Sequence, residues 1–213
     1  MLEVVKFTFN PFQENTYIVF NEFNHAIIID PGMYNASEQS FFIDYINQNQ
    51  LKPKMLLNTH CHIDHIFSNR FISEQYNLPL QIHAKDLPTL QMGVTSAALY
   101  NLKYHQSVEP SVFLEENTFI ELDNDKLKIL FTPGHSSGSI SFYCEQNAFV
   151  IAGDVLFKES IGRTDLPGGN FEVLSQSIKK ELYSLADDTI VFSGHGNETT
   201  IGHEKLHNPF VRP

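Results

Sequence analysis

The sequence predicts an α+β fold in which two packed β-sheets carry helices on their outer faces. Short apolar runs typical of buried strands recur along the chain, and two segments instead repeat apolar residues at helical spacing. The chain has 213 residues, 42% of them hydrophobic, which is enough for one well-buried core. No repeat or flexible linker divides it, so we expect a single domain, residues 1–213.

Eight strands are expected from the apolar runs. They are Val4–Phe9, Tyr17–Phe20, Ala26–Ile29, Lys54–Leu57, Leu127–Thr132, Ser139–Tyr143, Phe149–Ala152 and Thr189–Phe192. Strands come first, are then mixed with helices, and return near the end of the chain. That order suits two packed sheets with helices outside them.

Three segments are expected to be helical. Ser37 is the expected N-cap of the first, in which Phe41, Phe42, Tyr45 and Ile46 share one face. Asn170 is the expected N-cap of the second, whose apolar residues follow spacings of three and four: Phe171, Leu174, Ile178, Leu182 and Leu185. The third is Ile63–Tyr76.

Composition and charge exclude several classes of function. Lys and Arg number 14 against 25 Asp and Glu, a formal net charge of −11, and no basic stretch is present that would bind nucleic acid. Two cysteines are too few for a disulfide framework, and the N-terminus lacks the pattern of a signal peptide. The apolar runs are far too short to span a membrane. We therefore expect a cytoplasmic protein that acts on a small molecule, with neither nucleic acid nor membrane as a partner.

The placement of the histidines indicates a metal site. Three of the ten lie within residues 59–65, Thr-His-Cys-His-Ile-Asp-His, directly after a predicted strand. In an extended segment His60, His62 and Asp64 would share one side, with Cys61 on the other, and a turn into a helix would bring His65 to join them. Imidazole and carboxylate groups are the usual donors to a catalytic Zn²⁺.

Three further donors share a context, since each follows a predicted strand and adjoins a glycine. They are His135, Asp154 and His195. Glycine lets the backbone turn sharply at the end of a strand, where loops build active sites. With the first cluster they make seven candidate ligands, a number that suits two metals with a shared carboxylate and open positions for water.

The ordered set of donors resembles the metallo-β-lactamase superfamily. The resemblance covers most of the chain and implies a four-layer αββα sandwich with the metals at one edge, between the two sheets. It also implies how the ligands are divided. His60, His62 and His135 would hold the first metal, Asp64, His65 and His195 the second, and Asp154 would bridge the two.

Other segments resemble the short glyoxalase II-like hydrolases of that superfamily. They are Gly153–Phe157, Gly162–Gly169, Gly194–Gly202 and the tail His207–Phe210. Full glyoxalase II enzymes carry a C-terminal helical domain that helps to bind glutathione, and no such domain is expected here. The resemblance implies a metal-dependent hydrolase that cleaves a small thioester or ester, as a hydroxyacylglutathione hydrolase does.

The implied cofactors are two divalent metal ions, zinc in the first place, with iron or manganese as alternatives because the same donors suit all three. Such a pair lowers the pKa of a shared water from 15.7 towards about 7. The resulting metal-bound hydroxide would attack the carbonyl carbon, and Asp64 and Asp154 are the catalytic residues expected to orient it. Arg163 is a candidate for binding a substrate carboxylate, although a structural pair with Asp165 is favoured.

Three other functions fit parts of the sequence. Persulfide dioxygenases share Thr59–His62 and Gly162–Asp165 with this chain, and their single iron would map to His60, His135 and Asp154. A non-catalytic metal-binding module would be expected to lack a ligand, and none is missing here. Gly134–Gly138 also matches the G-x-S-x-G elbow of a serine hydrolase, but that elbow leads into a helix, whereas a strand is expected after Ser136.

Overall fold

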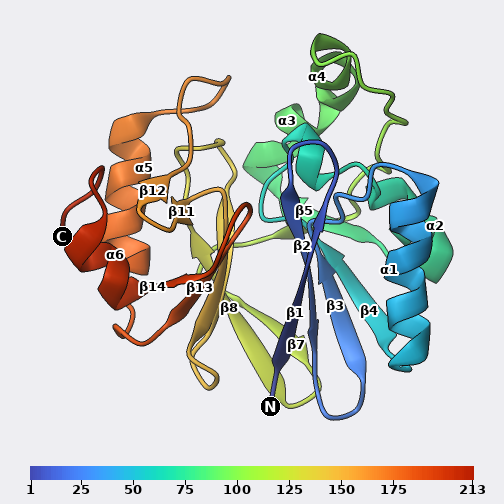
Figure 1. Ribbon diagram of the computed structural model, residues 1–213, viewed down its shortest axis with the longest axis horizontal. Coiled ribbons are helices and arrows are strands. Elements are labelled where there is room, and N and C mark those ends of the chain that lie inside the picture. The colour runs from blue at the N-terminus through green and yellow to red at the C-terminus, as the bar shows by residue number, and fades with distance from the viewer.

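Two six-stranded sheets form the centre of the computed structural model, which describes residues 1–213 (Figure 1). The first has the order β1 (Glu3–Phe9), β2 (Glu14–Phe20), β3 (His25–Ile29), β4 (Lys52–Leu57), β5 (Leu80–His83) and β6 (Val112–Leu114). Its first three strands are antiparallel, and β3 to β6 are parallel.

The second sheet runs β14 (Thr199–Thr200), β13 (Ile190–Ser193), β10 (Phe149–Gly153), β9 (Ile140–Cys144), β8 (Asp125–Phe131) and β7 (Phe119–Leu122). Only β10 and β13 pair in parallel. A separate hairpin joins β11 (Leu156–Phe157) to β12 (Ser160–Ile161).

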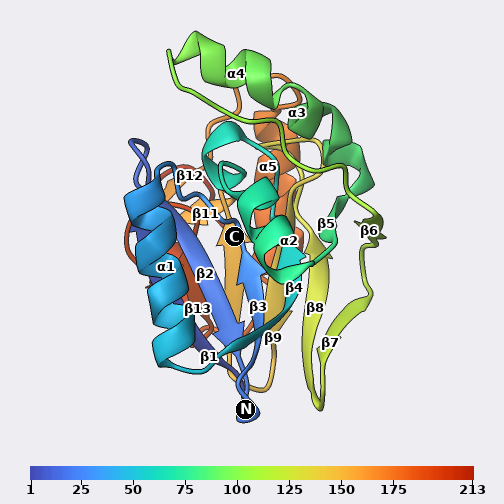
Figure 2. The ribbon, with the colours of Figure 1, turned by 90° about the vertical axis from the view of Figure 1, so that its right-hand side faces the viewer.

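Helices cover the outer face of each sheet, which confirms the predicted αββα sandwich. On the side of the first sheet lie α1 (Ala36–Gln48), α2 (Asn69–Tyr76), α3 (Leu87–Gln91) and α4 (Gly93–Leu99) (Figure 2). On the side of the second lie α5 (Phe171–Ser177), with its continuation Ile178–Leu182, and α6 (Ile201–His207). Short helical turns occupy Ile63–His65 and Ala84–Asp86.

Successive apolar residues of a strand point to opposite faces of its sheet, so each sheet packs against helices on one face and against the other sheet on the other. Along β3, Ala26 and Ile28 pack towards the helices, whereas Ile27 and Ile29 pack between the two sheets. The outer layer of the second sheet is built the same way, with Val150 of β10 against α5. Each sheet is therefore apolar on both of its faces.

All eight expected strands are present, but two of the helix predictions need correction. Asn35, not Ser37, caps α1, because its side chain accepts hydrogen bonds from the backbone of Ser37 and Glu38. The segment Ile63–Tyr76 is not one helix. A single helical turn is followed by a break, after which Ser68 precedes α2 and binds the carbonyl of Met33 through its hydroxyl.

The other helix prediction is confirmed, since the Asn170 side chain caps α5 by accepting from the backbone of Val173 at 3.0 Å. Strand β9 follows Ser136, whose hydroxyl lies 2.8 Å from that of Ser139, so the segment does not form the elbow of a serine hydrolase. No helix in the structure is both long enough and apolar enough to cross a membrane.

Candidate metal centre

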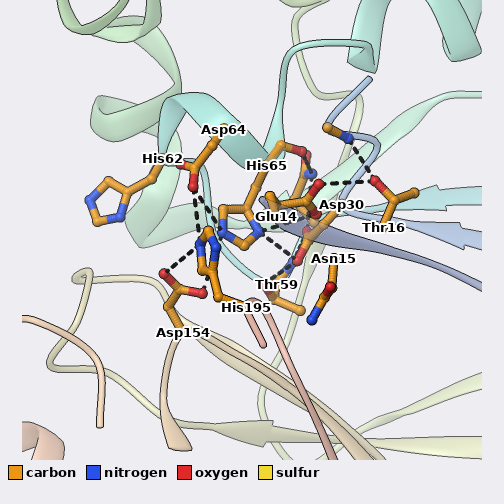
Figure 3. Close-up of polar contacts among 12 residues, drawn as sticks. Glu14, Asn15, Thr16, Asp30, Thr59, His62, Asp64, His65, Asp154 and His195 are labelled. Carbon is orange, nitrogen blue, oxygen red and sulfur yellow. Dashed lines mark hydrogen bonds and ion pairs between the residues drawn. The ribbon is translucent and has the colours of Figure 1, made fainter. Parts of the chain in front are cut away.

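All seven predicted ligands meet at one end of the two sheets, on loops that follow four different strands. Residues 60–65 follow β4, His135 follows β8, Asp154 follows β10 and His195 follows β13. Figure 3 shows Asp64, His65, Asp154 and His195 turned towards one another. Strands from both sheets thus contribute, which places the centre at the edge between them.

Three imidazoles form the first cluster. Nε2 of His135 lies 3.2 Å from Nε2 of His60 and 2.8 Å from Nδ1 of His62. These three nitrogens converge closely enough to share one ion. His60 and His135 are buried, and His62 and His135 also line the cavity above the centre.

The second cluster combines two imidazoles with a carboxylate. Oδ2 of Asp64 lies 3.1 Å from Nε2 of His195 and 3.7 Å from Nε2 of His65. These three groups also lie within reach of one ion. The two clusters have the composition and the division of ligands that the sequence resemblance implied.

Asp154 lies between the two clusters. Its Oδ2 is 3.5 Å from Nε2 of His135 in the first cluster and 3.5 Å from Nε2 of His195 in the second. Its Oδ1 is 3.4 Å from Nε2 of His65. One carboxylate therefore faces both groups of donors, as a bridging ligand must.

Contacts outside the centre fix which ring nitrogen carries the proton in four of its histidines, beginning with His135 and His195. Nδ1 of His135 lies 2.8 Å from the carbonyl oxygen of Arg163, and Nδ1 of His195 lies 3.1 Å from that of Phe12. A carbonyl oxygen can only accept, so both Nδ1 atoms donate. In the neutral ring each Nε2 then directs its lone pair into the centre.

Asp30 has the same effect on His65 and, through Thr59, on His60. Its Oδ2 lies 3.1 Å from Nδ1 of His65 and accepts from the Thr59 hydroxyl, whose oxygen lies 3.1 Å from Nδ1 of His60 (Figure 3). Asp30 also accepts from the Thr59 backbone at 2.7 Å. Although Asp30 lies near enough to His60 and His65 to share an ion with them, its oxygens are already used as acceptors, so it supports the ligands.

Sequence reasoning missed Asp30 and Glu14. A signal for Asp30 exists, because it follows β3 directly and precedes Pro31-Gly32, the strand-and-glycine context of the other donors. Glu14 begins β2 without any such signal. Glu14 is fully buried, and its Oε1 lies 3.7 Å from Nδ1 of His65. Burial raises the pKa of the Glu14 carboxyl well above its usual range.

These contacts show that the residues fit a pair of cations. With Nδ1 of His60 and His135 acting as donors, their two Nε2 lone pairs face each other at 3.2 Å, an arrangement that is repulsive unless a cation lies between them. Nε2 of His65 and Oδ1 of Asp154 are also buried with no hydrogen-bond partner. A buried polar atom without a partner is costly, and coordination of a metal would satisfy both.

The electrostatics of the metal-free centre separate its histidines into two kinds. Burial lowers the pKa of His60 well below its usual value and, with the nearby His135, lowers that of His62 to about 3. Burial also lowers the pKa of His195, but hydrogen bonds to Asp154 and Asp64 outweigh it and raise the value to about 10. Metal binding must therefore displace a proton from His195.

We expect the metal-free protein to be most stable near pH 6.5, the ordinary histidine pKa. Below it the unfolded chain protonates His62 while the folded chain does not, so stability falls as the pH drops towards about 3. Above it the folded chain keeps a proton on His195 that the unfolded chain loses, so stability falls as the pH rises towards about 10. Thermal unfolding in EDTA across this range measures the effect, and a midpoint that rises from pH 7 to pH 9 would contradict it.

Comparison with known proteins agrees with this geometry. The sequence profile of the metallo-beta-lactamase superfamily matches residues 9–195. The chain belongs to the metallo-β-lactamase superfamily. Its members are generally metal-dependent hydrolases, and the two His/Asp clusters indicate a binuclear site for divalent metals.

Three similar proteins match nearly the whole chain. A probable metallo-hydrolase, YqgX of Bacillus subtilis, is 36% identical over 94% of this chain and 93% of its own. The hydroxyacylglutathione hydrolase GloC of Haemophilus influenzae is 34% identical over 99% and 97%. The solved structure of TTHA1623 in a di-iron-bound form is 35% identical, has a TM-score of 0.87, and covers 97% of this chain and 100% of its own.

Two glycines of this superfamily member allow the backbone to place the Asp154 carboxylate where it lies. Gly153 precedes Asp154 with a φ of 52°, a left-handed conformation that side chains disfavour. Gly194 passes so close to Asp154 that a Cβ there would clash with Oδ1 of that residue. The glycines predicted to help build the site therefore do so through backbone conformation at one position and close approach at the other.

Arg163 lies at the rim of the cavity above the metal centre. Its guanidinium donates to Oδ1 and Oδ2 of Asp165 at 2.7 and 2.8 Å, so the structural pair favoured from the sequence is present. The side chain is 55% exposed, whereas its carbonyl accepts from the buried His135. The residue thus supports one ligand through its backbone and leaves its charge beside the cavity.

Proposed function

We propose that this chain is a metal-dependent hydrolase that cleaves a small thioester or ester, in the manner of a hydroxyacylglutathione hydrolase. The observation that carries the proposal is Asp154, which faces two separate groups of donors at the floor of an open cavity. The similarity to GloC over nearly the full length of both chains supports the thioester as the substrate class. We propose zinc for both positions, with iron or manganese as alternatives.

The bound ions would supply Lewis acidity and a water acidified to react at neutral pH. The residues of the chain position the reaction. Oδ2 of Asp64 and Oδ2 of Asp154 lie 3.1 and 3.5 Å from the same nitrogen of His195, so both carboxylates border the place where that water would lie, and we propose that they orient it. In the net reaction the water oxygen would bond to the acyl carbon, the C–S or C–O bond would break, and one proton of the water would pass to the departing thiol or alcohol, leaving a carboxylic acid.

Binding of the substrate is proposed to involve Arg163. A substrate carboxylate would compete with Asp165 for the guanidinium, which is exposed at the cavity rim and forms planar paired hydrogen bonds of the kind already seen with Asp165. We also propose that the protein acts as a single domain, that its substrate is a small molecule, and that it works in the cytoplasm.

The test is hydrolysis of a panel of thioesters and esters, S-lactoylglutathione among them, by protein reconstituted with zinc, iron or manganese. We expect metal-loaded protein to exceed metal-free protein by about 10³-fold or more, since a metal contributes several kcal/mol to such transition states. Oxygen uptake with glutathione persulfide by an iron-loaded form that hydrolyses nothing would instead establish the dioxygenase alternative. Tight metal binding with neither activity would establish the non-catalytic module.

A further inference from the structure

The cavity above the metal centre is larger than a small hydroxyacyl group requires. Its volume is about 630 Å³, within the range of sites that enclose drug-sized ligands. Metal ligands form its floor, and its walls come from both halves of the chain. Helix α4 rises on one side, and the segment between β12 and α5 rises at the same end of the molecule (Figure 1).

One face of α4 lines this cavity. The lining residues Met92, Ser96, Leu99 and Tyr100 follow spacings of four, three and one, which places them on a single side of the helix. Three of the four are apolar or aromatic. Across the cavity lie Phe157, Leu166 and Pro167, and Phe12 packs edge to face on Tyr100 with ring centroids 5.1 Å apart.

Folding does not account for these apolar side chains. A neighbouring face of α4 carries Gly93 and Ala97, both buried, and a Cβ at Gly93 would press on Tyr104. That face anchors the helix. Leu99 is instead 79% exposed and Met92 43% exposed, so their apolar surface faces the open cavity, where a ligand would remove it from water.

The charged residues that line the cavity indicate which charge a bound molecule can carry. Apart from the metal ligands, its only charged lining residues are Lys85 and Arg163, both cations. No other carboxylate lines the cavity, and the nearby Asp165 is already paired with Arg163. An uncharged or anionic molecule with an apolar portion therefore fits both the walls and the rim.

We infer that the substrate carries an apolar group of about four to eight carbon atoms that packs against the Met92–Leu99 face of α4. This inference rests on the proposed hydrolase function and concerns the part of the substrate that does not react. The apolar group belongs either to the acyl portion or to the leaving thiol, and both would meet the same wall.

Two series of thioesters distinguish these sources. In one, acyl groups from acetyl to octanoyl are joined to a constant N-acetylcysteamine. In the other, a constant acetyl group is joined to thiols from ethanethiol to octanethiol. We expect kcat/KM of the metal-loaded enzyme to rise by about fourfold per methylene in one of the series, because each buried methylene contributes a similar increment to binding.

The variants compared are the double substitution Met92→Gln, Leu99→Gln and the control Leu206→Gln. Leu206 is 72% exposed on α6 and lies outside the cavity, so it matches Leu99 in chemistry and exposure. We expect the double variant to lower the octyl-to-shortest ratio of kcat/KM by about tenfold or more, and the control to preserve the ratio. A ratio that survives in the double variant, or flat series in the wild type, would overturn the inference.

Calorimetric titration of the metal-loaded proteins with acetate and octanoate provides an independent readout. Tighter binding of octanoate than of acetate by the wild type, reduced in the double variant, supports the inference even if no thioester is cleaved. In that case the hydrolase proposal alone fails. Measurable hydrolysis with no chain-length dependence in either assay leaves the hydrolase standing and refutes the apolar site.

Discussion

Replacing Asp154 with asparagine is expected to abolish hydrolysis and to remove at least one of the two metals. Asp154 is the one group that faces both clusters, and its carboxylate supplies negative charge at 3.4 to 3.5 Å from three histidine nitrogens. An amide is similar in size but neutral, so it cannot bridge two cations as a carboxylate does. We expect kcat/KM to fall by about 10³-fold or more, equivalent to several kcal/mol of lost transition-state stabilisation.

Metal content and turnover of Asp154→Asn are to be measured together, beside Asp188→Asn, an exposed aspartate remote from the cavity. Unfolding in EDTA shows whether the variant is folded without metal. A variant that retains two metals and at least a tenth of the wild-type activity would disprove the bridging role.

Replacing Asp30 with asparagine is expected to weaken metal binding by about 10- to 100-fold, the usual cost of disturbing a partner of metal ligands. The Asp30 carboxylate accepts from Nδ1 of His65 and from the Thr59 hydroxyl. Both groups donate to the same oxygen, Oδ2, so an asparagine NH2 group at that position would face two donors. His65 and, through Thr59, His60 would then lose the contacts that direct their other nitrogens into the centre.

Rescue of activity by excess metal distinguishes a role of Asp30 in orienting the metal ligands from a general loss of structure in the variant. In Asp30→Asn, saturating zinc is expected to restore kcat to within about tenfold of the wild type, because the ligands themselves are intact. Asp188→Asn again serves as the matched surface control. Activity that stays lost in excess zinc, with the fold intact by circular dichroism, would show that Asp30 does more than orient ligands.

The clustering of the seven candidate ligands could be predicted because each of these residues carries a local signal. Residues 60–65 combine four donors in one short segment, and His135, Asp154 and His195 each end a strand beside glycine. The ends of strands lie together at one edge of a sheet sandwich. Donors that each follow a strand in the sequence are therefore expected to lie close together in space. Asp30 shares that signal, but a single carboxylate after a strand does not by itself indicate a function. Its role in supporting the histidines is seen only in its contacts with His65 and Thr59.

Parts of the fold could not be predicted, because their stability comes from tertiary contacts. Strand β6 has two exposed residues among three and is defined by its pairing with β5. Helix α4 has no side-chain N-cap and is too short to be stable alone, so its place depends on the packing of Gly93 and Ala97. By contrast, β3 and β10 could be predicted as strands from the sequence, because each is a continuous apolar run that is buried on both faces.

The number and kind of metal ions per chain test the central claim most directly. Protein purified without chelator, and protein reconstituted with zinc, iron or manganese, are to be analysed by elemental mass spectrometry, with Asp154→Asn in parallel. The two-cluster geometry predicts about two divalent ions per wild-type chain and fewer in the variant. A single iron per chain that never rises towards two, or no retained metal after reconstitution, would contradict the binuclear centre.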